Sequence, residues 1–292
     1  MMNAIQTDNL TKYYGRHRGI ENICLSVEEG DFFGFIGPNG AGKSTTIRTL
    51  LGLLSPTGGD AHIFGKNIVR DKLDILADVG YLPSEASFYN GMRVKDVLAF
   101  SARLRKKDCK KEAAALCERL SLDPDRKISE LSLGNRKKVG IVLALQHRPH
   151  LYILDEPTSG LDPLMQQEFY QLLRERNEAG ATVFLSSHIL SEVSRYCRHA
   201  AVIRDGSILV SDSIENLGHT GVKRVTLQGV SSVPAIDGIS DESFSDGCAR
   251  FLYSGDQGGL IRALAAVPFT DISITDPDFE EIFLHYYTEE GK

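Results

Sequence analysis

The sequence contains no apolar run long enough to cross a membrane. No window of its 292 residues reaches the roughly 18 consecutive apolar residues that a membrane-spanning helix requires. The first residues also lack the basic region and the apolar segment that together mark a signal peptide. We therefore expect a soluble protein that stays in the cytoplasm.

Cysteine is sparse, and basic residues are not in excess. The five cysteines include no C-x-x-C pair and show no spacing typical of zinc ligands, which fits a reducing compartment. The formal net charge is −6, whereas a nucleic-acid-binding surface usually requires a basic excess. We expect no nucleic-acid partner. The length suits one large domain and one small one.

A glycine-rich segment dominates the first part of the chain. Residues 37–45 read Gly-Pro-Asn-Gly-Ala-Gly-Lys-Ser-Thr and fit G-x-x-x-x-G-K-[ST], the pattern of a phosphate-binding loop. An apolar run at residues 32–36 precedes this phosphate loop, and a helix-compatible stretch at residues 44–54 follows it. This context argues against a chance glycine-rich turn and predicts a nucleotide site.

Each residue type in the phosphate loop has a physical reason. Glycines at positions 37, 40 and 42 remove Cβ atoms, so that backbone N–H groups can approach phosphates closely. The following helix directs its N-terminal N–H groups at the same phosphates. Lys43 adds a positive charge for the β- and γ-phosphate oxygens, and the Ser44 hydroxyl is placed to hold Mg²⁺. The loop residues that we predict to bind the nucleotide are Gly37, Pro38, Asn39, Gly40, Ala41, Gly42, Lys43, Ser44 and Thr45.

Two acidic residues and a histidine follow buried strands. The apolar run at residues 151–154 is followed by Asp155 and Glu156, and ligands collect at the carboxyl ends of strands in open α/β sheets. We predict that Asp155 serves Mg²⁺ and that Glu156 orients or deprotonates the attacking water. The alternative for Glu156 is a cap of the next segment. His188 directly follows the apolar strand at residues 182–187, a position that favours contact with the γ-phosphate over a structural role.

Tyr14 and the second half of the chain complete the pattern. Tyr14 directly precedes a glycine, where it could pack against the core or stack on a nucleobase. Residues 94–121 have helical periodicity.

A polar, glycine-rich stretch near residues 216–222 marks a domain boundary. Beyond it, strands at residues 222–227, 249–253 and 271–275 and a helix at residues 278–289 indicate a small α+β domain.

These motifs together resemble those of the ATP-binding subunits of ABC transporters, most closely of export systems whose membrane subunit is a separate chain. Residues 37–45 match the Walker A loop, residues 151–156 match Walker B with its catalytic glutamate, and residues 159–162 resemble the D-loop. His188 corresponds to the switch histidine and Tyr14 to the adenine-stacking aromatic. The resemblance is close over residues 4–215 and looser over residues 216–292.

The resemblance implies an α/β fold and a division into domains. The core is expected to be a P-loop NTPase of the ABC ATPase type, with a mixed sheet, flanking helices and a helical subdomain. This ATP-binding domain would span residues 1–215, and its helical subdomain about residues 84–148. Residues 216–292 would form a small C-terminal α+β accessory domain.

Two segments depart from the family pattern. Residues 131–135 align with the family signature L-S-G-G-Q, but Leu133 replaces the first glycine and Asn135 the glutamine. Ser132 and Gly134 remain, and the resemblance implies that they contact the γ-phosphate. Ser84 stands where the family usually has the glutamine of its Q-loop.

The resemblance also implies an activity and partners. Lys43, Glu156 and His188 would be catalytic, Ser44 and Asp155 would hold Mg²⁺, and Asp162 of the D-loop would contact the nucleotide. The signature of one subunit closes over the ATP of another, so two ATP molecules would hold a dimer together, with a second and identical subunit. The dimer would dock on an integral membrane permease near residues 84–97, at the inner face of the cell membrane, and power export.

Two other classes of function stay open at this point. One is a soluble ABC ATPase that acts in translation or DNA repair, although such proteins usually carry two ATPase domains or a long coiled-coil insertion. The other is a regulatory module that binds ATP as a ligand, against which the retained Glu156 argues.

Overall fold

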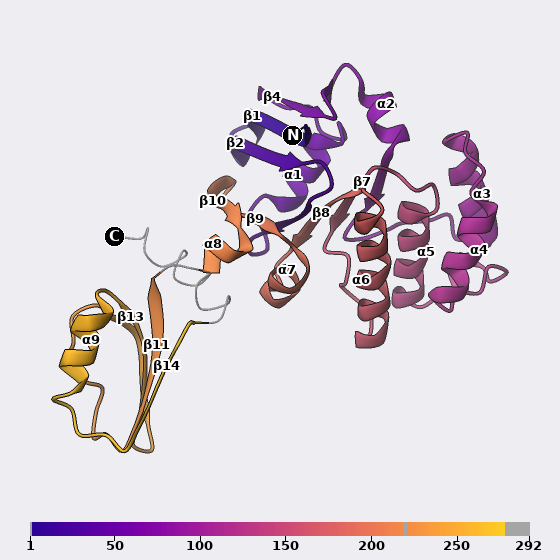
Figure 1. Ribbon diagram of the computed structural model, residues 1–292. Helices are drawn as coiled ribbons and strands as arrows, with labels where there is room; N and C mark the ends of the chain where they lie inside the picture. The colour runs from indigo at the N-terminus through magenta and orange to yellow at the C-terminus, as the bar shows by residue number, and fades with distance from the viewer. Residues whose placement is uncertain (1, 219–220, 278–292) are drawn as a thin grey trace. The chain divides into compact units, whose positions relative to one another are not determined.

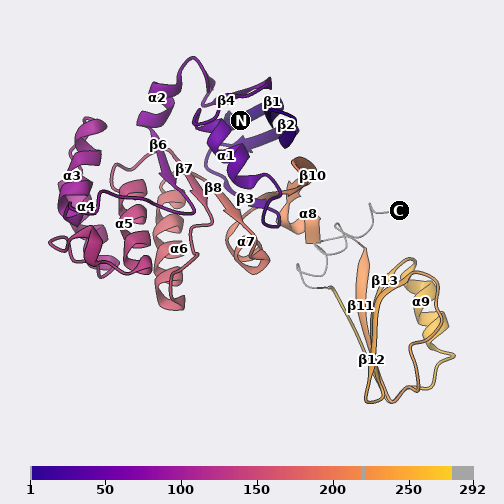
Figure 2. The same cartoon turned by 180° about the vertical axis from the view of Figure 1, so that it is seen from behind.

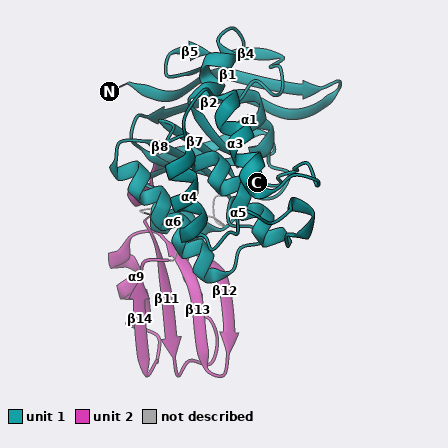
Figure 3. Cartoon of the chain, turned by 90° about the vertical axis from the view of Figure 1, so that its right-hand side faces the viewer, with its two compact units in different colours: residues 1–212 teal, residues 213–292 magenta. Residues whose placement is uncertain are grey.

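The computed structural model describes residues 2–218 and 221–277. The chain forms two compact units, residues 1–212 and residues 213–292 (Figure 3). The boundary expected between residues 215 and 216 falls close to this division, and the assignment of functional domains to the units stays a prediction. The helix expected at residues 278–289 lies outside the described residues.

The first unit is built on a six-stranded sheet in the order β10-β9-β3-β8-β7-β6. Its strands are β3 (Phe32–Ile36), β6 (Val79–Leu82), β7 (Leu151–Asp155), β8 (Thr182–Ser187), β9 (His199–Arg204) and β10 (Ser207–Ser213). The pairs β3–β8, β3–β9, β7–β8 and β6–β7 are parallel. Every residue of β3, β7 and β8 is buried, as their unbroken apolar runs predict for a sheet covered on both faces.

A second sheet of four strands, in the order β2-β1-β4-β5, packs against the first. Its strands are β1 (Asn3–Tyr14), β2 (His17–Glu28), β4 (Gly58–Ile63) and β5 (Lys66–Asn67). In β2, Ile23, Leu25 and Val27 are buried while the residues between them are exposed, the alternation of a sheet with one face on the core. β1 and β2 are longer than the short strands expected from the sequence.

Helices cover both faces of the six-stranded sheet. Helix α1 (Lys43–Leu50) buries Ile47 and Leu50 in one core with residues of both sheets, and it lies between them (Figure 1). On the other face lie α6 (Pro163–Glu178) and α7 (Leu190–Tyr196) (Figure 2). A Cβ at Gly34 of β3 would come within 2.4 Å of Val193 on α7, so this glycine permits the close packing. Helix α2 (Lys72–Ala77) precedes β6.

The region expected to be helical at residues 94–121 is two helices, α3 (Val94–Leu104) and α4 (Lys110–Arg119). Between them, residues 105–108 are all charged, so no apolar side chain continues the buried stripe. Lys106 adopts a left-handed φ of 54°, which ends the first helix. Helix α5 (Leu133–Leu145) packs against α3, α4 and β6. A 3₁₀ turn at Ile128–Glu130 precedes it.

The second unit is a four-stranded antiparallel sheet with one helix on it. Its strands, in the order β12-β13-β11-β14, are β11 (Val222–Gln228), β12 (Ile239–Ser245), β13 (Cys248–Ser254) and β14 (Asp271–Thr275). Helix α9 (Gln257–Leu264) buries Leu260 and Leu264 against Val225 and Phe251, which face each other across β11 and β13. Helix α8 (Ile214–Gly218) opens the unit. The sequence analysis did not predict β12 or α9.

No helix within residues 2–218 and 221–277 is both long and apolar enough to cross a membrane.

Candidate nucleotide site

The phosphate loop joins β3 to α1, as its pattern predicts. Gly40 and Gly42 have φ values of 84° and 110°, which residues with a Cβ rarely adopt. Gly37 is required for a different reason, because a Cβ there would lie 2.4 Å from the carbonyl oxygen of Ile203 in β9. Two glycines therefore shape the loop, and the third lets it pass close to the neighbouring strand.

Lys43 is the first residue of α1, and only 5% of its surface is exposed. Its Nζ donates hydrogen bonds to the carbonyl oxygens of Gly37 at 2.5 Å and Pro38 at 3.2 Å. The same Nζ lies 3.1 Å from Oε1 of Glu156. The ammonium group thus lies inside the curve of the loop and reaches the end of β7.

A pocket of about 370 Å³ opens at the phosphate loop. It is lined by Tyr14, Arg18, Gly19, Pro38, Asn39, Gly40, Gly42, Lys43, Ser44, Thr45, Ser84 and Glu156. Residues from β1, β2, the loop, the segment after β6 and the end of β7 therefore face one cavity. Most of the residues that the sequence analysis assigned to a nucleotide are among them.

The aromatic residue at this pocket, Tyr14, is half exposed, and its ring lies close to Lys12 and Gly19. Tyr14 exposes 46% of its surface, and the Nζ of Lys12 lies 5.6 Å from its ring centroid. A Cβ at Gly19 would come within 2.8 Å of the tyrosine ring, so only glycine lets the ring lie this close to β2. The sequence analysis missed Arg18 and Gly19, because neither belongs to a local motif.

Asp155 ends β7 and is completely buried. Its Oδ1 accepts a hydrogen bond of 2.7 Å from the Ser186 hydroxyl, which stands opposite it on β8. Its Oδ2 has no hydrogen-bond partner among the described residues. A buried carboxylate oxygen without a hydrogen-bond donor is unfavourable unless a cation binds to it. One carboxylate and the Ser44 hydroxyl match the protein contribution that Mg²⁺ needs when nucleotide phosphates supply further ligands.

Glu156 connects two of the other candidate groups. Its Oε1 lies 3.1 Å from Nζ of Lys43, and its Oε2 lies 2.7 Å from Nδ1 of His188. Its backbone has a φ of 48°, an uncommon conformation for a residue with a long side chain. The structure therefore brings both Lys43 and His188 into contact with Glu156, although the three residues lie far apart in the sequence.

The signature and D-loop residues lie elsewhere. Ser132 is the N-cap of α5 and accepts from the backbone N–H of Asn135 at 3.3 Å, and Asp162 caps α6 in the same way. A Cβ at Gly134 would lie 3.1 Å from the carbonyl oxygen of Gly160. The described residues that line the 370 Å³ pocket do not include Ser132, Gly134 or Asp162. Leu133, at the altered signature position, is 75% exposed.

Two side chains beside the acidic pair have shifted pKa values. Burial lowers the pKa of Lys137 on α5 to about 8, and the carboxylates of Asp155 and Glu156 oppose this shift. Burial raises the pKa of the Tyr81 hydroxyl, and the charge of Asp155 adds to the effect. The low-dielectric surroundings of Asp155 strengthen the attraction of this edge for a cation.

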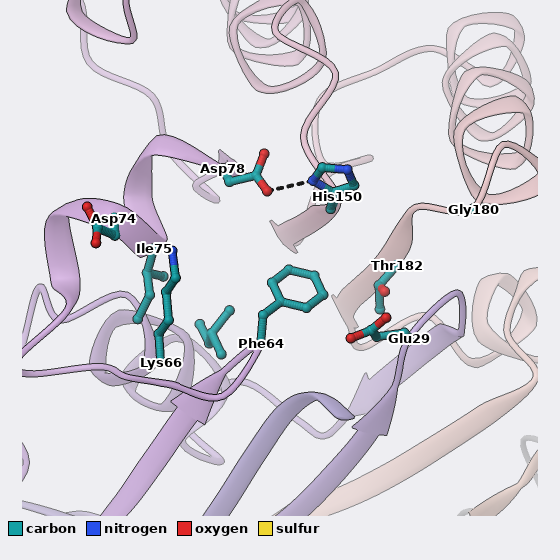
Figure 4. Close-up of a pocket in the computed structure, with 10 residues that line it drawn as sticks. Glu29, Phe64, Lys66, Asp74, Ile75, Asp78, His150, Gly180 and Thr182 are labelled. Carbon is teal, nitrogen blue, oxygen red and sulfur yellow. Dashed lines mark hydrogen bonds and ion pairs between the residues drawn. The ribbon is translucent and has the colours of Figure 1, made fainter. Parts of the chain in front are cut away.

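A second pocket, of about 230 Å³, lies where the parallel strands begin (Figure 4). Asp78 and His150 immediately precede β6 and β7, and Thr182 opens β8. Nδ1 of His150 and Oδ2 of Asp78 are 2.6 Å apart. This edge of the sheet is opposite to the one that carries Asp155, and none of the predicted site residues lines the pocket.

A largely parallel sheet, a glycine-rich loop between a strand and a helix, and an Asp–Glu pair at the end of a nearby strand define a P-loop nucleoside triphosphatase. Comparison with known proteins narrows this class. A family model described as ABC transporter matches residues 20–159. The bacitracin transport ATP-binding protein BcrA of Bacillus licheniformis is 33% identical over 300 residues, which cover 97% of this chain and 97% of that protein. The chain therefore belongs to the ATP-binding subunits of ABC transporters, and it is an ATPase.

Other relatives and solved structures agree with this family. The linearmycin resistance ATP-binding protein LnrL of Bacillus subtilis is 31% identical, and the match covers 78% of this chain and 76% of that protein. The solved structure of an ATP-binding subunit of an ABC transporter superposes with a TM-score of 0.70 at 27% identity, over 73% of this chain and 91% of that one. An ATP-binding cassette in its ADP conformation gives a TM-score of 0.63 at 27% identity, over 74% and 95%. These structures confirm the predicted α/β P-loop fold.

Proposed function

We propose that this ATPase hydrolyses Mg²⁺-bound ATP as one half of a dimer and so powers export through a separate membrane permease. The observation that carries the proposal is the contact of Glu156 with both Lys43 and His188 at the edge of the pocket. Ser44 and Asp155 would hold Mg²⁺, which supplies charge neutralisation at the phosphates. Tyr14 and the phosphate loop would hold the adenine and the phosphates.

Lys43 and Glu156 would exchange partners when ATP binds. The ammonium group of Lys43 now neutralises Oε1 of Glu156 at 3.1 Å. A γ-phosphate oxygen that takes up this ammonium leaves Oε1 available to accept a proton from a water molecule. His188 keeps the other carboxylate oxygen in place through its contact of 2.7 Å. The base would thus become competent only when the substrate is present.

The variant Glu156→Gln tests this assignment. The amide keeps the size of the side chain but cannot take a proton, so we expect turnover to fall by roughly 10²–10⁴-fold, while the affinity for ATP stays within a few-fold of wild type. Glu175→Gln is the matched control. Glu175 lies on α6, outside the pocket, and its Oε2 is 2.6 Å from Nη1 of Arg119 on α4. Turnover that survived in Glu156→Gln would refute the assignment of the base.

The second subunit would supply the missing contacts to the nucleotide. Ser132, Gly134 and Asp162 belong to the family motifs but do not line the pocket of their own chain. A second, identical copy that approached with its α5 N-terminus would add N–H groups and a helix dipole to the γ-phosphate. ATP would then hold the dimer closed, and hydrolysis would release it.

The membrane partner would dock near residues 84–97 and hold the dimer at the inner face of the cell membrane. One relative is named for bacitracin transport and another for linearmycin resistance, and a role in resistance fits outward transport. A pull-down of tagged Glu156→Gln chain with ATP from detergent-solubilised membranes tests the partner. We expect a stoichiometric polytopic membrane protein, whereas ribosomes or DNA without such a protein would contradict the proposal.

A further inference from the structure

Lys137 is a buried lysine whose ammonium group donates to three backbone carbonyl groups. It lies in α5, five residues after Ser132, and 5% of its surface is exposed. Its Nζ donates to the carbonyl oxygens of Pro83 at 3.3 Å, Ser84 at 3.0 Å and Glu156 at 3.0 Å. An ammonium group has three donors, so these three carbonyls use all of them.

The three carbonyls belong to two segments, the start of the candidate docking segment for the permease and the residue proposed as the base. Pro83 and Ser84 directly follow β6, and Glu156 directly follows β7, its parallel neighbour in which Leu154 pairs with Leu82. Ser84 also lines the nucleotide pocket. One side chain of the signature helix thus joins the candidate base to the start of the candidate docking segment.

The backbone of Glu156 needs such support. A left-handed φ is unfavourable for a residue with a Cβ, and such conformations persist only where surrounding contacts fix them. The N–H of Glu156 donates to the carbonyl oxygen of Ser186 at 3.2 Å, and its C=O accepts from Lys137. Contacts at both ends of the residue therefore set the direction in which its carboxylate points.

We propose that Lys137 is a positioning residue for ATP hydrolysis, which holds Glu156 in its productive conformation and ties it to Pro83 and Ser84. The inference rests on the proposed role of Glu156 as the base. A partner that displaces the segment after β6 would shift Lys137 and, through it, Glu156. In this chain, where Ser84 replaces the usual Q-loop glutamine, the link between docking and hydrolysis would pass through a lysine and backbone carbonyls.

The first experiment compares Lys137→Met with Lys138→Met in the full chain. Lys138 is the same residue type on the same helix, but none of the described hydrogen bonds or ion pairs involves it, so its loss controls for the change of charge. We expect kcat of Lys137→Met to fall by about 10- to 100-fold, because a small misplacement of a base has an effect of this size. The KM for ATP should change less than twofold, because Lys137 does not line the pocket.

A second variant keeps the test valid if Lys137→Met does not fold. Lys137→Arg keeps the charge, but a planar guanidinium cannot direct donors at three carbonyls as an ammonium does. We expect a folded protein with a kcat reduced at least threefold and an unchanged KM. A kcat equal to that of wild type in either folded variant would overturn the inference.

A double-mutant cycle separates positioning from general damage. If Lys137 acts through Glu156, its substitution should leave the residual rate of Glu156→Gln unchanged. A further fall by the same factor as in the wild-type background would show a merely structural role and overturn the inference. High turnover in Glu156→Gln alone would instead refute the proposed base, so the two failures are distinguishable.

Discussion

Replacing Ser186 by alanine isolates the support of the candidate magnesium ligand. The Ser186 hydroxyl is completely buried, donates to Oδ1 of Asp155 at 2.7 Å and accepts from the N–H of Glu156 at 3.3 Å. Since Oδ2 of Asp155 has no hydrogen-bond partner among the described residues, Ser186→Ala would leave the whole carboxylate without a donor. A hydrogen bond to a charged group contributes roughly 1.5–3 kcal/mol, and we expect a loss of unfolding free energy of this size.

The functional effect should be on the metal. Removing a partner that orients a metal ligand typically lowers metal affinity by about 10- to 100-fold. Binding of a fluorescent ATP analogue, measured in Mg²⁺ and again in EDTA, gives this quantity directly. We expect Ser186→Ala to lose about 10- to 100-fold of the affinity in Mg²⁺ and to match wild type in EDTA.

Ser187→Ala is the matched control. Ser187 is the next residue of β8, is equally buried, and donates to a different carboxylate, that of Glu192, at 3.0 Å. Urea unfolding followed by circular dichroism should show comparable destabilisation in both variants. If the magnesium-dependent affinity fell equally in both, or in neither, Asp155 would not be the metal ligand that its environment suggests.

Two further predictions concern the stacking of the nucleobase on Tyr14 and the effect of pH on the stability of the fold. Stacking on an aromatic ring contributes roughly 1–3 kcal/mol, so Tyr14→Leu should raise the KM for ATP by about 5- to 100-fold with little change in kcat, and Tyr14→Phe should restore it. Burial, reinforced by the charge of Arg105, lowers the pKa of His147 from 6.5 to about 4. The folded chain therefore holds this imidazole neutral. The folded state loses stability below pH 6.5, because there the unfolded chain takes up a proton that the folded chain does not. Between about pH 7.5 and pH 5 the unfolding free energy should fall by about 2 kcal/mol from this group, a dependence that His147→Gln should lack and the exposed His150→Gln should retain.

Local motifs predicted much of the candidate site, whose residues stay a prediction, because the chemistry of phosphate binding fixes a short run of residues. The phosphate loop, its flanking strand and helix, and the Asp155–Glu156 pair could all be identified from contiguous sequence. The parallel topology then implied that the strand ends meet, and the observed contact of Glu156 with His188 at 2.7 Å follows from that topology.

Other features depend on contacts that no local pattern records. Gly19 looks like an ordinary strand glycine, yet the Tyr14 ring occupies the space that its Cβ would need. Lys137 is one of three consecutive basic residues at positions 136–138, and only the fold shows that it is the buried one. In both cases the deciding neighbour belongs to another element of the structure.

Errors in the predicted elements have a similar origin. Helical periodicity continues across residues 94–121 because apolar residues happen to keep phase on both sides of the charged run at residues 105–108. The pattern does not contain the left-handed turn at Lys106. Strand β12 was missed because its residues are mostly exposed and polar, so its pairing with β13 leaves no apolar alternation to detect.

If Glu156 is the base, as proposed, its contacts would make a single chain complete in its acid–base groups and still dependent on partners. Its carboxylate is shared between Lys43 and His188, and its backbone is held by Ser186 and Lys137. In the proposed mechanism, nucleotide binding would act on the first of these contacts, a second subunit would act beside α5, and the permease would act on the segment after β6. Because each event reaches the same residue through a different element, the rate of hydrolysis would depend on all three, and ATP would be consumed fastest in the assembled transporter.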